Sequence, residues 1–142
     1  MPEIVASNAL IEERAVKLRE LLNAGHALCL FQNDFKPLVS SALFDFTEAT
    51  FPGYLPKNLN GAFGIPKKVI DGEWQTTSIK FTWTCTGDWP AKVYGWFVRG
   101  GGKVKLSHRF FLPVTMIAGQ EVIVRVDAQV WSITAIPRRA GV

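Results

Sequence analysis

The chain has 142 residues, of which 48% are hydrophobic and 20% are charged, and its formal net charge is +4. This length predicts one domain whose apolar core is large enough to fold without disulfide bonds or metal ions. No apolar run approaches the roughly 18 residues of a membrane span, and the amino terminus lacks the pattern of a signal peptide. The basic residues are scattered, so the composition predicts neither a membrane partner nor a specific nucleic-acid partner.

An amphipathic helix is predicted within residues 1–25. Ser7 or Asn8 can cap its first turn, and Gly25 is suited to its end. Its apolar residues recur at helical spacing, and they are Ile11, Ala15, Leu18 and Leu22. This face either covers one end of the chain's own sheets or docks on a neighbouring subunit.

A buried strand and a long loop are expected next. The run from His26 to Phe31 is continuously apolar, which is typical of a strand covered on both faces. Residues 33–66 are interrupted by several prolines and glycines and predict an irregular loop, a kind of segment that often forms interfaces. Its aromatic residues either anchor the loop or form a recognition surface, and they are Phe46, Phe51 and Tyr54.

The rest of the chain predicts strands. Asp71-Gly72 favours a hairpin between residues 65–70 and 73–78. A half-buried strand from Thr76 to Cys85 is expected to form an antiparallel meander with residues 93–98 and 104–111. Alternation from Glu121 to Val130 predicts the last strand.

Together these elements predict a mainly β fold, a single-domain antiparallel β-sandwich of the jelly-roll or immunoglobulin-like kind. The sandwich is expected to span residues 26–136, after the helical segment 1–25 and before a basic tail at 137–142. No repeat and no linker between domains is present.

No pattern of catalytic or metal-binding residues is present. Cys29 and Cys85 both lie in apolar strand patterns, where a buried neutral thiol is expected. His26 and His108 have no ligand spacing around them. We therefore predict no enzyme activity, no cofactor and no metal.

The five tryptophans are the one compositional excess. Trp74 and Trp89 fall at strand ends or turns, where an exposed indole could stack on a sugar or a base. A carbohydrate-binding β-sandwich is therefore an alternative function.

Residues Phe46 to Tyr54 read FTEATFPGY, and this segment resembles the FTEAxFxGY segment of a family of small phage-encoded structural proteins. A similar segment precedes it at residues 28–33, and two others follow it at 93–98 and 109–116. The resemblance spans Leu28 to about Val130.

The resemblance implies a structural component of a phage virion, located in the virion after synthesis in the host cytoplasm. It implies an accessory capsid protein of the cement or decoration type, or a tail or baseplate component. The implied partners are the major capsid protein or other virion proteins, together with further copies of the chain. The predicted contact residues are Ile11, Leu18, Leu22, Phe46, Phe51, Tyr54, Trp74, Trp89, Arg138 and Arg139.

Overall fold

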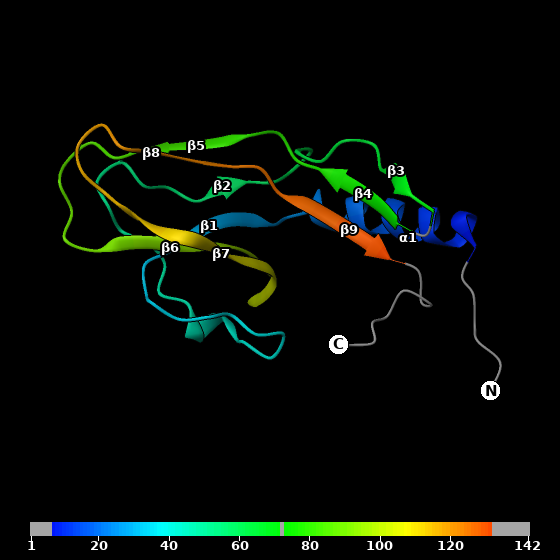
Figure 1. Ribbon diagram of the computed structural model, residues 1–142, viewed down its shortest axis with the longest axis horizontal. Coiled ribbons are helices and arrows are strands. Elements are labelled where there is room, and N and C mark those ends of the chain that lie inside the picture. The colour runs from blue at the N-terminus through cyan, green and yellow to red at the C-terminus, as the bar shows by residue number, and fades with distance from the viewer. Residues whose placement is uncertain (1–6, 72, 132–142) are drawn as a thin grey trace. The chain divides into compact units, whose positions relative to one another are not determined.

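The computed structural model describes residues 7–71 and 73–131 (Figure 1). They form two compact units, each assembled from segments that are far apart in the sequence. Of the described residues, unit one contains 7–24, 61–79 without residue 72, and 125–131. Unit two contains 25–60 and 80–124. The predicted tail at 137–142 lies outside the described residues.

The mainly β fold with one amino-terminal helix is confirmed, and every strand pairing within the described residues is antiparallel. The strands form three separate sheets, one in unit one and two in unit two.

Unit one consists of a helix packed on a three-stranded sheet (Figure 1). Ser7 caps the helix by accepting a hydrogen bond from the amide of Leu10 over 3.2 Å. The helix packs against β4 and β9, so it covers a sheet of its own chain, as one of the two predicted arrangements requires. The sheet order is β3-β4-β9, and the elements are α1 (Asn8–Leu22), β3 (Lys67–Ile70), β4 (Glu73–Thr77) and β9 (Asp127–Trp131).

The hairpin predicted at Asp71 is confirmed. Strands β3 and β4 pair with Lys67 opposite Gln75 and Ile70 opposite Glu73, with one register shift between them. Pairing continues before β3, because Phe63 bridges to Ser78 and the amide of Gly64 donates to the carbonyl of Thr77.

Unit two contains a four-stranded sheet in the order β2-β1-β6-β7 and a two-stranded sheet of β5 and β8. Its elements are β1 (Ala27–Phe31), the 3₁₀ turn η1 (Leu43–Asp45), β2 (Lys57–Asn58), β5 (Phe81–Thr84), β6 (Lys92–Gly100), β7 (Lys103–Thr115) and β8 (Glu121–Val124). As predicted, β1 is buried on both faces from Leu28 to Phe31. A core cluster of Cys29, Phe31, Phe46 and Phe97 lies against this sheet.

The predicted meander from Thr76 is wrong at its first strand. Strand β4 ends at Thr77 in unit one, and β5 begins at Phe81 in unit two. Strand β5 pairs with β8 and not with β6, whereas the β6–β7 hairpin is present. The backbone explains the pairing, because Cys85 exchanges hydrogen bonds with Gln120 and Gly119 and so extends the β5–β8 ladder.

The strand predicted from Glu121 to Val130 is split in the same way. Its alternation is correct, since Val122, Val124, Val126 and Ala128 are buried and Ile123 is exposed. The pairing changes at Val126, whose amide donates to the hydroxyl of Ser78 over 2.9 Å instead of to a main-chain carbonyl. The predicted strand is therefore divided into β8 and β9, with Val126 in the segment between them.

Candidate functional site

A group of four polar side chains lies beside the core of unit two. The carboxylate of Glu48 accepts a hydrogen bond from the Tyr54 hydroxyl over 2.6 Å and lies 3.7 Å from the guanidinium of Arg99. Arg99 also donates from Nε to Sγ of Cys29 over 3.2 Å. The Tyr54 oxygen in turn accepts from the amide of Leu30 over 3.2 Å.

Burial keeps the thiol neutral, although the Arg99 guanidinium acts to lower its pKa. Burial, and then the nearby Glu48 carboxylate, raises the pKa of Cys29 to about 11. Burial and the Glu48 hydrogen bond raise the pKa of Tyr54 far above its ordinary range. A thiol held protonated at neutral pH is a poor nucleophile, so the group fixes the loop onto β1 and does not activate Cys29.

Two further structural findings concern the described residues alone. They contain no group of three or more His, Cys, Asp or Glu side chains close enough to hold a metal ion. Nor do they include a helix with the length and apolar character of a membrane span.

Two of the three predicted contact residues on the helix are buried within the chain. Ile11 and Leu22 are buried and Leu18 is half-buried, because this side of α1 packs inside unit one. Docking of Ile11 and Leu22 on a neighbouring subunit is therefore wrong, while contact through Leu18 stays a prediction. The apolar residues that α1 does expose are Leu10, Val16 and Leu21.

Two of the three loop aromatics, Phe46 and Phe51, anchor the loop in the chain's own core, while partner contact through Tyr54 stays a prediction. Phe46 and Phe51 are buried, and Tyr54 is half-buried. Phe46 packs edge-on against Phe31 with ring centroids 5.3 Å apart, and Phe51 packs edge-on against Tyr54 at the same distance. The prediction that Phe46 and Phe51 contact a partner directly is therefore wrong, because their rings fill the chain's own core.

The two predicted tryptophans are half-buried, and their contact with a partner or a sugar stays a prediction. Trp89 packs edge-on against Phe51, with centroids 5.8 Å apart. The Nε1 atom of Trp74 is buried without a hydrogen-bond partner among the described residues. Of the other described indoles, Trp83 is buried and Trp96 is half-buried. Arg138 and Arg139 lie outside the described residues.

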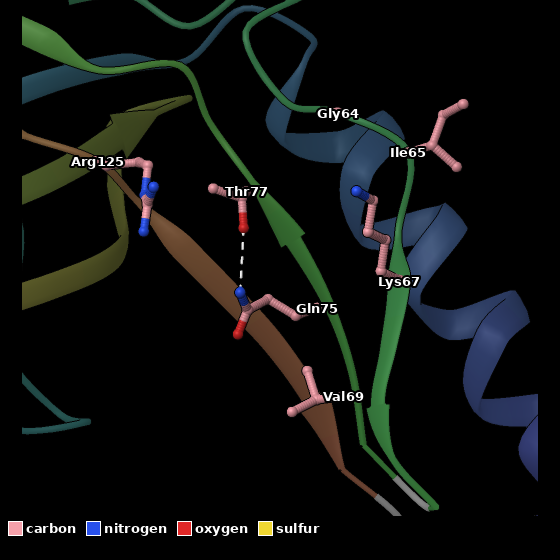
Figure 2. A pocket seen from close by; sticks show the side chains of 7 residues that line it. All are labelled: Gly64, Ile65, Lys67, Val69, Gln75, Thr77 and Arg125. Carbon is pink, nitrogen blue, oxygen red and sulfur yellow. Dashed lines mark hydrogen bonds between the residues drawn. The ribbon is translucent and has the colours of Figure 1, made fainter.

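A groove of about 640 Å³ lies on the sheet of unit one (Figure 2). Lys67 comes from β3, Gln75 and Thr77 from β4, and Arg125 from the segment just before β9. Gln75 donates to the Thr77 hydroxyl over 3.1 Å, as Figure 2 shows. The positive charge of Arg125 is partly balanced, because its Nε atom lies 3.7 Å from the carboxylate of Asp127.

A second groove, of about 340 Å³, lies in unit two between residues 37–41 and Val104–Ser107 of β7. Its walls include Leu38 and Val39, and Val39 is fully exposed. Farther along β7, Phe111 is 98% exposed. The sequence reasoning missed these residues, although Phe110-Phe111-Leu112 is an apolar run that breaks strand alternation and could have indicated an exposed apolar site.

No protein-family model, no curated protein and no solved structure matches this chain.

Proposed function

We propose that this chain is a structural protein of a phage virion, and specifically an accessory capsid protein of the cement or decoration type. The observation that carries the proposal is the FTEATFPGY segment at Phe46 to Tyr54 and its resemblance to phage structural proteins. In this chain the segment has a structural role: Phe46, Ala49 and Phe51 are buried, and Glu48 bonds to Tyr54. A segment that stabilises the fold is the part of a structural family expected to keep its sequence pattern.

Exposed apolar side chains in unit two support a role in protein contacts. Val39, Phe44 and Phe111 are all almost entirely exposed. A decoration protein stabilises a shell by burying surface between neighbouring subunits, and exposed apolar residues of this kind provide such surface.

The proposal includes the location and the partners. The chain is made in the host cytoplasm and assembles into the virion, where it contacts the major capsid protein or other virion proteins and further copies of itself. The finer fold assignment, a jelly-roll or immunoglobulin-like sandwich, belongs to the same proposal. The tail or baseplate role remains the alternative within the virion class.

Quantitative mass spectrometry of purified virions tests the proposal. We expect the chain in a fixed ratio to the major capsid protein, in the head fraction after heads and tails are separated. Enrichment in the tail fraction would assign it to the tail or baseplate. Absence from virions would overturn the structural role.

A point substitution is the suitable test of whether α1 contributes to assembly. Deleting residues 1–25 would also remove Ile11, Ala15 and Leu22 from the core of unit one, so a loss of assembly would not be informative. Leu21 is 57% exposed, and Leu21→Asp leaves that core intact. Reduced incorporation of Leu21→Asp, with Glu20→Asp unchanged, is expected if the exposed side of α1 contacts a neighbour.

A further inference from the structure

We propose that the groove between residues 37–41 and β7 of unit two binds an extended segment of a partner protein that alternates acidic and apolar side chains. The segment adds to the sheet as a further strand beside β7. This inference rests on the proposed function and deepens it, because it names the chemistry of the partner segment.

Strand β7 lies at the edge of its sheet. It is the terminal strand of its sheet and is long, running from Lys103 to Thr115. Its outer side has no strand partner among the described residues, so amide and carbonyl groups there are available to a new strand. Adding an extended peptide to such an edge is a common mode of recognition, in which the backbone provides affinity and alternate side chains provide specificity.

The opposite wall of the groove, residues 37–41, is held in place by hydrogen bonds before any partner binds. The amide of Leu38 donates to the hydroxyl of Ser41 over 2.8 Å, and the amide of Ser41 donates to the carbonyl of Leu38 over 3.0 Å. Arg109 of β7 ties the loop to the strand, since its guanidinium donates to the carbonyl of Phe35 and to the carboxylate of Asp34, each over 2.7 Å. A partner segment would therefore meet a fixed wall and would not have to order this loop.

The side chains around the groove are exposed apolar residues on the loop and basic residues on β7. Leu38 and Val39 are 65% and fully exposed in the groove wall, and apolar partner side chains would remove them from water. Strand β7 contains three Lys or Arg residues and no Asp or Glu. Arg109 is paired with Asp34, but Lys103 and Lys105 are exposed and have no ion-pair partner among the described residues. The β6–β7 ladder has a register shift opposite these residues, where Val98 pairs with Leu106 and Arg99 with Val104, so Lys105 is an extra residue of β7. Acidic side chains on the incoming segment would pair with the two lysines on either side of this irregularity.

The same charges argue against a second copy of this chain as the occupant. Two β7 strands pairing over residues 103–109 would place Lys103, Lys105 and Arg109 of each copy along one seam. Like charges at neighbouring positions across strands are destabilising. An acidic segment from a different protein satisfies the edge without this repulsion.

The test is an NMR titration of the ¹⁵N-labelled chain with synthetic octapeptides of alternating Glu and Val. We expect saturable shifts of the amides of residues 38–41 and 104–107. A peptide with Lys in place of Glu should not bind. Lys105→Glu should weaken binding of the Glu peptide by about tenfold. Lys92→Glu, an equal charge change at the far end of the β6–β7 ladder, should leave affinity unchanged.

Three results would overturn the proposal. These are the absence of shifts in β7, equal binding of the Lys peptide, and concentration-dependent shifts of β7 amides without peptide, which would assign the edge to a second copy. A chain present in virions whose groove binds no Glu peptide refutes this inference alone, while a chain that binds the peptide but is absent from virions refutes the proposed function alone. Circular dichroism of each variant confirms that its fold is retained.

Discussion

The hydroxyl of Tyr54 is held between the carboxylate of Glu48, at 2.6 Å, and the amide of Leu30, at 3.2 Å. It thus satisfies the main-chain donor of Leu30, whose carbonyl accepts from the amide of Ala49 over 2.8 Å. The last residue of the FTEATFPGY segment therefore attaches the long loop to β1, an inner strand of its sheet.

Replacing Tyr54 with Phe removes this oxygen and keeps the ring. The Leu30 amide would lose its acceptor in a buried strand, so we expect the free energy of unfolding to fall by about 1–3 kcal/mol. Urea denaturation at neutral pH measures this change. Tyr94→Phe is the matched control, because the Tyr94 hydroxyl has no hydrogen-bond partner among the described residues, and equal destabilisation by the two variants would contradict the assigned role of Tyr54.

Gly95 of β6 lies at a point in the four-stranded sheet where there is no room for a side chain. A Cβ atom there would overlap the carbonyl oxygen of His108 and lie 2.6 Å from the ring of Phe31, and neither group is a flexible side-chain end. We expect Gly95→Ala to lower the unfolding free energy by about 1–3 kcal/mol or to prevent folding. In Gly87→Ala the new methyl would meet only Pro52 at an ordinary contact distance of 3.5 Å, so its denaturation midpoint should be nearly unchanged.

Local signals in the sequence predicted local structure well. The Ser7 cap, the turn at Asp71 and the apolar run before Gln32 each depend on neighbouring residues, and the helix, hairpin and buried strand they predict are present. Burial along residues 121–128 was also predicted, because alternation depends only on which side of the strand faces the core.

Strand partners could not be predicted in the same way. Alternation continues unchanged through Val124 and Val126 although the chain passes there from one unit to the other, so the pattern contains no signal of the break. Likewise, Phe46 and Phe51 fit both an anchor and a contact surface, since sequence gives their apolar character and not what covers them. The groove in unit two depends on a loop and a strand more than 60 residues apart, a relationship that only the fold provides.

Ser78 provides a test of the point at which the pairing changes. Its buried hydroxyl accepts from the amide of Val126 over 2.9 Å and donates to the carbonyl of Ile79 over 2.8 Å. Ser78→Ala leaves the Val126 amide buried without this acceptor, and we expect a loss of about 1–3 kcal/mol. Hydrogen exchange at Val126 should also become faster, whereas Thr82→Ala on the exposed side of β5 should change neither quantity appreciably. Unchanged exchange at Val126 would show that the hydroxyl does not protect this amide.

The dependence of stability on alkaline pH tests the environment of Cys29. Its pKa is about 11 in the folded chain and 9.0 ordinarily, so between these pH values the unfolded chain releases the thiol proton while the folded chain retains it. Stability should therefore be retained below pH 9 and should decrease as the pH rises to about 11. The raised pKa of Tyr54 adds a decrease of the same sign. Urea denaturation across this range should give a steeper decrease for the native chain than for Cys29→Ala, because the variant lacks the thiol and keeps Tyr54. Parallel curves for the two proteins would mean that the Cys29 thiol ionises equally easily in both states, contrary to its burial and its position near Glu48.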